Sequence, residues 1–390
     1  MTLRPVRSMT HDKPPRNTAS QKILLLSLSF ENGGVERDTI NLANGFTGLG
    51  LSVTMVVRER KLFFLSMLDP SVRIVVFNGR NDRQLEAELR DLLRRDRPTV
   101  VLSAKDEDDA IAIRVKRKLG SGIPSRFYLR IGTPLATRDI EQKGFFFSRW
   151  LNRRRLRKTL ADSDGIITHS AGVARELVAF YQVPPEKAVT LPNPTMTPDF
   201  FEKANAEVNH PWFASEAPPV IIAVGRLARV KDFPTLLRAF AILRQQRTCR
   251  LMILGDGKQK SRLARLADEL GISDDVELHG FCQNPYAFLK RAALLAVSSI
   301  REGGPIVLIE ALALGIPAVA TDCPTGPREI LQDGRLGRLT PPGDAEALAK
   351  ALQETLDHPP DPEVLKASVA AFTQENSSRA HLSALGLTIH

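Results

Sequence analysis

The chain has 390 residues, which is too long for one ordinary hydrophobic core and predicts two domains of under about 200 residues each. Its composition, with 43% hydrophobic and 25% charged residues, is typical of globular proteins. No stretch approaches the roughly 18 consecutive apolar residues of a membrane span, which excludes a transmembrane helix.

The net charge of +10 comes from the first half of the chain. Residues 1–200 hold 33 Lys and Arg against 22 Asp and Glu, whereas residues 201–390 hold 21 against 22. This asymmetry indicates an anionic partner for the first half: a membrane surface, a polyanionic acceptor or nucleic acid. A solvated basic face is the alternative interpretation.

The N-terminal region is expected to begin with a tail. Residues 1–20 are polar, basic and rich in Pro, which predicts disorder. The apolar run 23–30 that follows is interrupted by Ser27 and Ser29 and leads into Gly33 and Gly34. Because no small-residue cleavage site follows the run, it favours a buried first strand over a signal peptide.

Short apolar runs then alternate with amphipathic helical stretches. Strands are predicted in the first half at 23–28, 52–57, 73–76, 99–102, 126–131 and 165–168, with helices such as 36–49 and 84–96. The second half predicts strands at 220–224, 251–254, 276–278, 293–297 and 318–320, and helices at 233–245, 258–270, 306–314 and 344–356. Such alternation indicates parallel sheets with right-handed crossovers. The fold class is therefore α/β, with two Rossmann-like domains.

Proline residues mark the boundary between these domains. They cluster before a polar stretch that ends at Pro218 and Pro219 and breaks both periodicities. We expect an N-terminal domain at 21–198, a C-terminal domain at 199–372, and a helix at 373–390 that returns to the N-terminal domain. Ligands of open α/β sheets bind beyond the carboxyl ends of the strands, so functional residues are expected where the two domains face each other across a cleft.

One segment of the second half combines an acidic, Gly-rich turn with a helix start. An apolar run at 294–298 leads into the turn, Pro occupies the first helical position, and Gly315 follows the last. The free backbone amides at such a helix start suit a diphosphate, and carboxylates here would accept hydrogen bonds from sugar or ribose hydroxyls. An ordinary βα turn is the alternative. The candidate residues are Glu302, Gly303, Gly304, Pro305, Ile306, Val307 and Glu310.

Two cations follow the first strand of the second half. The strand ends in Gly225, Arg226 comes next, and Lys231 stands five residues further on, before a helix. Two cations that leave one strand end can hold a pyrophosphate leaving group. Solvated surface cations are the alternative.

Other familiar motifs are missing from the sequence. Gly33 and Gly34 follow the first strand without the GxGxxG pattern, so we interpret them as a loop that lets backbone approach a ligand. The seven His are scattered and no metal-binding constellation stands out, so no metal is expected. The acidic run 106–109 is interpreted as the start of a helix.

The segment 143–158 mixes aromatic residues with seven cations and no acid. Basic residues beside Phe and Trp are typical of a helix that lies on an anionic membrane surface. A helix that packs its aromatics into the core is the alternative. No recognised nucleic-acid module is present, so no nucleic-acid partner is expected.

Taken together, these motifs resemble family 4 of the retaining glycosyltransferases, which have the two-domain GT-B fold. The resemblance covers about residues 22–385. It rests on the E-x7-E pair Glu302 and Glu310, the Gly225-Arg226 and Lys231 clamp, and Gly33-Gly34. The segments 192–194, 254–257 and 279–281 also fit.

The resemblance implies roles for these residues. Arg226 and Lys231 would hold the diphosphate, Glu310 would bind the ribose, and Glu302 would contact the transferred sugar. The amides from Gly304 to Val307 would touch the sugar hydroxyls and phosphates, and the backbone near Phe281 and Cys282 would face the base. Such enzymes need no metal or other cofactor, because the departing diphosphate helps to deprotonate the acceptor hydroxyl.

The segment 322–331 resembles the enzymes that build bacterial surface glycans on lipid carriers or lipopolysaccharide. The resemblance thus implies transfer of a hexosyl or N-acetylhexosaminyl group, from a UDP-linked donor, to a hydroxyl of a glycan or lipid-linked acceptor. The expected place of action is the cytoplasmic face of the cell membrane. A nucleotide-sugar 2-epimerase and a non-catalytic membrane-associated partner are the alternatives.

The sequence departs from this family pattern at one place. Many relatives carry a His near the reacting carbon in the first domain, where this chain has 128–134 without a His. Arg130 or a loop residue is therefore expected to take part of that role.

Overall fold

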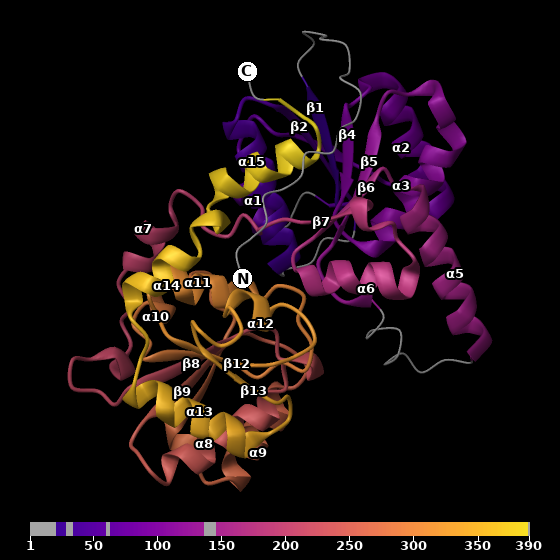
Figure 1. Ribbon diagram of the computed structural model, residues 1–390. Coiled ribbons are helices and arrows are strands. Elements are labelled where there is room, and N and C mark those ends of the chain that lie inside the picture. The colour runs from indigo at the N-terminus through magenta and orange to yellow at the C-terminus, as the bar shows by residue number, and fades with distance from the viewer. Residues whose placement is uncertain (1–20, 29–33, 60–62, 136–145, 389–390) are drawn as a thin grey trace.

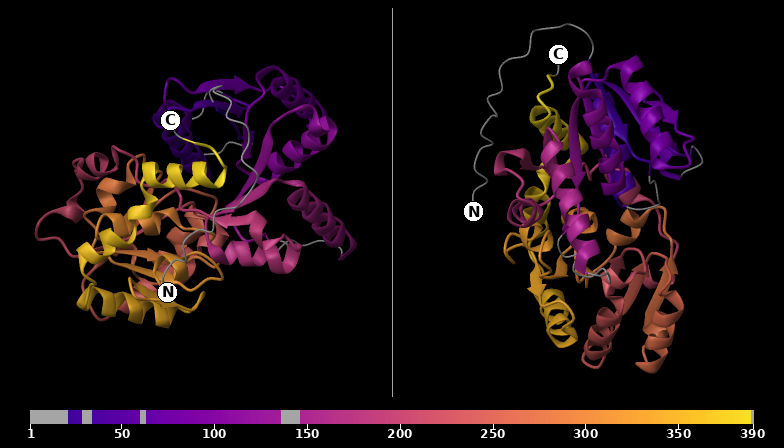
Figure 2. Two further views of the ribbon diagram at one scale, coloured as in Figure 1. Left: turned by 45° about the horizontal axis from the view of Figure 1, so that its top comes forward. Right: turned by 90° about the vertical axis from the view of Figure 1, so that its right-hand side faces the viewer.

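The structure is a computed structural model that describes residues 21–28, 34–59, 63–135 and 146–388 (Figure 1). The predicted N-terminal tail, Gly33 and the start of the basic segment lie outside these residues. Two parallel sheets form the two domains, and the right-hand view of Figure 2 shows one domain stacked on the other. The expectation of two Rossmann-like domains is confirmed.

The N-terminal sheet has seven strands in the order β3-β2-β1-β4-β5-β6-β7, and all its pairings are parallel. Its strands are β1 (Lys22–Leu26), β2 (Ser52–Val57), β3 (Arg73–Val76), β4 (Val100–Ser103), β5 (Arg126–Ile131), β6 (Gly165–Thr168) and β7 (Ala188–Thr190). The helices between them are α1 (Gly34–Gly48), α2 (Asp82–Asp96), α3 (Asp106–Leu119), α5 (Phe146–Asp162) and α6 (Ala171–Tyr181).

Both faces of this sheet are buried, which explains the continuous apolar strands in the sequence. Leu24 and Leu26 of β1 point into a core that α2, α3, α5 and α6 share. The alternate residues Ile23 and Leu25 point to the opposite face, where α1 and the C-terminal helix cover them. This alternation gives a three-layer α/β/α domain.

The C-terminal sheet has six strands in the order β10-β9-β8-β11-β12-β13, again with parallel pairings. Its strands are β8 (Val220–Val224), β9 (Arg250–Leu254), β10 (Val276–Gly280), β11 (Leu294–Val297), β12 (Ala318–Thr321) and β13 (Arg338–Thr340). One face packs on α8 (Phe233–Arg244), α9 (Lys260–Glu269) and α13 (Ala345–Asp357). The other packs on α7 (Phe200–Asn205), α10 (Pro285–Leu289), α11 (Ile306–Ala313) and α14 (Pro362–Ser368).

The last helix, α15 (Gln374–Ala384), returns to the N-terminal domain and packs on α1 (Figure 1). A Cβ on Gly45 of α1 would lie 2.0 Å from Ser378 Oγ of α15, so only glycine allows this close approach. Leu382 of α15 and Leu385, directly after the helix, join the core beneath α1. The last described helix therefore lies on the N-terminal domain.

The structure differs from the sequence-based elements mainly at the sheet edges. Strands β7 and β13 were not predicted. Each has three residues at one end of its sheet order, which is too short for a periodic pattern. The acidic run at 106–109 does begin a helix, α3, as predicted.

Candidate functional site

The Gly-rich turn follows β11 and leads into α11, as the sequence predicts. Pro305, predicted at the first helical position, instead has extended backbone angles and precedes the first helical residue, Ile306. The hydroxyl of Thr325 donates to the carbonyl of Glu302 and fixes the turn from the loop after β12. The first amides of α11 thus follow Glu302 closely along the chain, and the start of a helix can bind an anion.

The structure brings two of the predicted catalytic residues together. Lys231 Nζ lies 2.6 Å from Glu302 Oε1, although 71 residues separate them in sequence. Ser299 Oγ donates to the same carboxylate oxygen at 2.6 Å. The carboxylate is 12% exposed and the ammonium 24%. An ammonium has three donors, so Lys231 can hold Glu302 and a further anion together.

Gly225 and Arg226 lie at the same strand end. Gly225 donates its backbone N–H to the carbonyl of Leu254 at the end of β9. A Cβ on Gly225 would lie 3.2 Å from Lys231 Cε, so the lysine stem passes directly over this glycine. Arg226 is exposed beside it. The two predicted diphosphate cations therefore both follow β8, and Lys231 borders the turn that precedes α11.

The two domains touch at this turn. A Cβ on Gly303 would lie 1.5 Å from the carbonyl oxygen of Gly132, which follows β5 in the N-terminal domain. Gly304 packs on His169, with 3.2 Å between its hypothetical Cβ and His169 Cβ. A Cβ on Gly34 would lie 3.4 Å from the Cδ1 of Ile306. The predicted loops of both domains thus meet at one interface.

Glu310, the predicted ribose ligand, is 2% exposed and paired across the interface. Arg37 of α1 donates to its Oε1 and reaches it from the N-terminal domain, 273 residues away in sequence. The Arg37 guanidinium also lies 5.5 Å from the ring centroid of Tyr286. Burial raises the pKa of Glu310 above its ordinary value, and the charge of Arg37 and hydrogen bonds from Arg37 and Tyr286 oppose that shift. Sequence reasoning assigned no role to Arg37.

His169 faces Gly304 from the N-terminal domain and lies beside Arg130. Sequence reasoning did not connect these two residues. His169 follows β6, and its Nε2 lies 3.3 Å from Arg130 Nη2. Arg130 is 3% exposed and forms an ion pair with the buried Asp38. Burial, and secondly the charge of Arg130, lower the pKa of His169 to about 3, so its imidazole is neutral at neutral pH.

That Arg130 or a loop residue takes part of the role of the missing His stays a prediction, and the structure offers the loop residue His169 as a candidate. Arg130 is occupied by Asp38, whereas His169 contacts the turn that carries the predicted sugar contacts. The available signal was its position directly after a strand, at the same edge where β5 ends. The sequence alone could not distinguish His169 from the other six His, because only the strand order of the sheet places β6 beside β5.

Phe281 and Cys282, predicted to face the base, follow the end of β10. The Phe281 side chain is 55% exposed, while Cys282 is half-buried against the C-terminal core. All three cysteines are free, and burial raises the pKa of each thiol. A thiol with a raised pKa carries little thiolate and is therefore unreactive.

One cluster of potential metal ligands appears that the sequence did not indicate. Glu277 lies 2.9 Å from His210 Nε2 and 2.8 Å from His279 Nδ1. The backbone N–H of Trp212 donates to His210 Nδ1 at 3.2 Å, so His210 carries its proton on Nε2 and donates it to Glu277. The three residues thereby form a hydrogen-bonded cluster.

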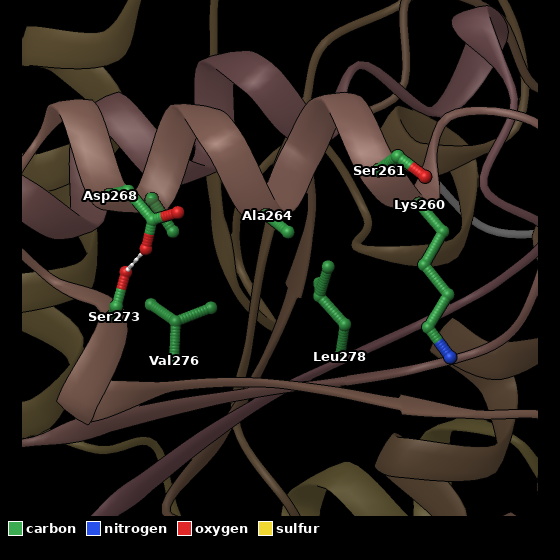
Figure 3. A pocket seen from close by; sticks show the side chains of 8 residues that line it. Lys260, Ser261, Ala264, Asp268, Ser273, Val276 and Leu278 are labelled. Carbon is green, nitrogen blue, oxygen red and sulfur yellow. Dashed lines mark hydrogen bonds between the residues drawn. The ribbon is translucent and has the colours of Figure 1, made fainter.

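A separate hollow lies within the C-terminal domain, between α9 and the edge strand β10 (Figure 3). Its lining includes Lys260 at one end and Asp268 with Ser273 at the other, with Val276 and Leu278 between them. It contains none of the predicted site residues. The predicted residues Gly303, Gly304 and Glu310 lie instead where the two domains touch.

Helix α5 carries the described part of the basic segment. Trp150 is 48% exposed, and Arg154 lies 5.5 Å from the centroid of its ring. Arg153 donates to the carbonyl of Phe180, itself 47% exposed on α6. Leu160 packs inward, so the outer face of α5 combines cations with an exposed aromatic ring. Among the described residues, no helix is long and apolar enough to cross a membrane.

Comparison with known proteins places the fold and the family. Residues 32–197 match the family described as Glycosyltransferase Family 4, and residues 207–371 match Glycosyl transferases group 1. The structure superposes on Anabaena Alr3699/HepE in complex with UDP with a TM-score of 0.77 and 17% identity, covering 94% of this chain and 100% of that one. It superposes on the lipopolysaccharide outer core galactosyltransferase WaaB with a TM-score of 0.71 and 18% identity, covering 94% and 99%.

Two curated proteins have greater sequence identity over shorter lengths. The chain is 31% identical over 195 residues to the N-acetylgalactosamine-N,N'-diacetylbacillosaminyl-diphospho-undecaprenol 4-alpha-N-acetylgalactosaminyltransferase of Campylobacter jejuni, covering 50% of this chain and 51% of that protein. It is 34% identical over 138 residues to the lipopolysaccharide 1,6-galactosyltransferase of Salmonella typhimurium, covering 33% and 37%. The chain thus spans about half the length of these relatives, or less.

The two facing Rossmann-like domains define a protein of the GT-B fold class. Within that class, the two matched regions together cover most of the described chain. The chain belongs to the glycosyltransferases of family 4 and group 1.

Proposed function

We propose that this protein transfers a hexosyl or N-acetylhexosaminyl group from a UDP-sugar to a hydroxyl of a glycan or lipid-linked acceptor, with retention of anomeric configuration. The observation that carries the proposal is the meeting of Lys231, Glu302 and the start of α11 at the carboxyl ends of β8 and β11. Relatives named as lipopolysaccharide and diphospho-undecaprenol glycosyltransferases support this choice of acceptor.

The proposed chemistry breaks the bond between the anomeric carbon and the diphosphate oxygen and forms one to the acceptor oxygen. The acceptor proton passes to the departing diphosphate. Arg226 and Lys231 stabilise the negative charge that develops on that group, and the free amides at the start of α11 add dipole stabilisation. Glu302 and the backbone of Gly304 orient the sugar, while Glu310 holds the ribose hydroxyls.

The first test is thermal stabilisation of the purified protein by UDP, GDP, ADP, CMP and their common sugar conjugates. A ligand that binds only the folded state raises the melting temperature. At a ligand concentration one hundred times the Kd, it adds about 2.7 kcal/mol to the free energy of unfolding. We expect UDP and one UDP-sugar to stabilise the protein, and Glu310→Ala to abolish the shift. No shift with any nucleotide would contradict the proposal.

Turnover then tests the role of Arg226. We expect Arg226→Ala to lower kcat by about 100- to 1000-fold, corresponding to about 2.7–4 kcal/mol of lost leaving-group stabilisation. The control is Arg238→Ala, which removes an exposed cation on α8. Unchanged turnover in a folded Arg226→Ala protein would refute this role. A product that carries a new glycosidic bond separates transfer from epimerisation of free nucleotide sugar.

We also propose that α5 docks the protein on an anionic membrane surface. The exposed Trp150 ring and the exposed cations Arg153, Arg154 and Arg155 support this orientation. We expect the protein to sediment with vesicles that contain phosphatidylglycerol, and binding to weaken at high salt because a membrane holds such cations electrostatically. The Trp150→Ser and Arg154→Gln double variant should lose most of this binding. Equal sedimentation of the variant would contradict the proposal.

A further inference from the structure

Strand β10 is an edge of the C-terminal sheet. It ends the strand order, and among the described residues β9 is the one strand that pairs with it. Of the four edge strands in the two sheets, β10 is the longest, with five residues against four in β3 and three in β7 and β13. Proteins protect strand edges with short strands, Lys or Pro, and β10 (VELHG) contains neither residue. Its outer edge can therefore pair with a further strand.

A hollow runs along this edge, between β10 and α9 (Figure 3). Val276 and Leu278 line it from the strand, and both are only half-buried although they lie on the side of the helix. From the helix, small side chains such as Ser261 and Ala264 line it. Because the distance between packed helices depends on the side chains at their contact, these small residues leave room for a second helix close to α9.

The two ends of the hollow carry opposite charges. The Lys260 ammonium lies 3.6 Å from the position of a Cβ on Gly280, so this cation marks the carboxyl end of β10. Asp268 marks the other end, where the hydroxyl of Ser273 donates to its carboxylate. Both charged residues belong to α9, and about 12 Å of helix separates their backbones. They therefore do not pair with each other within one chain.

A groove with a cation at one end and an anion at the other is complementary to a second copy of itself. A two-fold axis perpendicular to the sheet would place β10 of one copy antiparallel to β10 of the other, with both α9 helices on the same face. Lys260 of each copy would then lie beside Asp268 of the other. A purely acidic or purely basic partner would match only one end of the hollow.

The charges on the other face of β10 favour one register of this pairing. Directly opposite residues of an antiparallel pair share a face, so a symmetric pairing must be centred on one residue. Centring on Glu277 would oppose two carboxylates, centring on Val276 would oppose Glu277 to Asp275, and centring on His279 would oppose two imidazoles. Centring on Leu278 opposes this residue to its own copy and Glu277 to His279, two side chains that already lie 2.8 Å apart within one chain.

We propose that the protein forms a two-fold symmetric dimer through β10 and α9, in which the two C-terminal sheets join into one continuous sheet. The axis passes beside Leu278, and Lys260 of each copy pairs with Asp268 of the other. The hollow contains none of the residues assigned to the donor. The dimer and the proposed function can therefore fail independently.

Sedimentation velocity of the full chain over a concentration series tests the dimer. We expect wild type to dimerise, and Lys260→Glu or Asp268→Lys alone to raise the dimer Kd by about tenfold or more, because each variant opposes like charges at both ends of the interface. A mixture of the two variants should form a heterodimer, since each contact then joins opposite charges. The control is Lys258→Glu, which changes an exposed cation outside the hollow and should dimerise as wild type does.

Cysteine crosslinking tests the register. Opposite Cα atoms of an antiparallel pair lie about 4.5–5.5 Å apart, which a disulfide can span. We expect Leu278→Cys to give a covalent dimer on oxidation with copper–phenanthroline. Val276→Cys, which lines the same hollow, should give none, because residue 276 would lie opposite Gly280 of the second copy.

Three results would overturn the proposal. One is a wild-type protein that stays monomeric throughout the concentration series. Another is a dimer that the folded single variants Lys260→Glu and Asp268→Lys form as tightly as wild type, or a mixture of the two that forms no heterodimer. The third is crosslinking of Val276→Cys but not of Leu278→Cys. Thermal melting of each variant verifies that it is folded.

Discussion

Because two histidines are buried, we predict that the protein loses stability in mildly acidic solution. Burial lowers the pKa of His169 and of His381 on α15 to about 3, from an ordinary value of 6.5. The fixed charge of Arg130 acts in the same direction on both rings. The carbonyls of Leu191 and Ser377 favour the protonated rings but do not reverse the shifts.

The direction of the effect follows from proton binding. Each folded-state pKa lies below the unfolded value, so the unfolded chain takes up protons first as the pH falls below 6.5. The stability contributed by the two neutral rings is complete above pH 6.5 and is lost as the pH falls towards about 3. One pH unit inside this window is worth about 1.36 kcal/mol for each histidine.

Only the part of a change from pH 7 to pH 5 that lies below the ordinary pKa of 6.5 affects stability, which is about 1.5 pH units. The expected loss is therefore about 2 kcal/mol for each histidine and about 4 kcal/mol for the pair. A natural protein has only about 5–15 kcal/mol of stability in total, so this loss is large. It does not depend on whether the folded pKa values are 3 or 4, because both lie below pH 5.

Urea unfolding followed by circular dichroism at pH 7, 6 and 5 measures the loss. His381→Asn is the informative variant, because the Asn amide can replace the Nδ1–H that donates to the carbonyl of Ser377 at 2.8 Å. This variant cannot take up a proton, so it should lose about 2 kcal/mol where wild type loses about 4. His358→Asn, at the exposed end of α13, is the matched control and should behave as wild type.

Two results would refute this reasoning. One is a wild-type stability that changes by less than about 1 kcal/mol between pH 7 and pH 5. The other is a His381→Asn protein whose stability depends on pH as that of wild type does. That result would show that His381 has an ordinary pKa in the folded wild-type protein.

Three further predictions concern the interface. Gly303→Ala places a methyl group against the carbonyl of Gly132, so we expect a larger radius of gyration by X-ray scattering; unchanged dimensions would contradict the tight contact. Lys231→Met leaves Glu302 without its ammonium and should lower kcat/KM by about 100- to 1000-fold, with partial recovery in Lys231→Arg; full activity of the Met variant would exclude a leaving-group role. Because burial raises the pKa of Glu310, UDP affinity should fall as the pH drops, and a titration by calorimetry that shows no such fall would contradict ribose binding by its carboxylate.

The sequence determined the elements and their class. Strands buried on both faces must be continuous apolar runs, and helices that cover them must be amphipathic, so two series of alternating elements predicted two parallel sheets. The same reasoning placed Glu302, Lys231 and Arg226 at strand ends. These positions depend on local periodicity and on turns near Gly and Pro, which a single sequence displays directly.

Only the tertiary structure decided which of these residues meet and what faces them. Arg37 pairs with Glu310 across 273 residues, and His169 faces Gly304 because the order of β5 and β6 brings its strand end to the interface. Neither contact has a local pattern, since each depends on how the two domains pack together. The short edge strands β7 and β13 were missed for a related reason: three residues carry too little periodicity, and hydrogen bonds from a neighbouring strand define them.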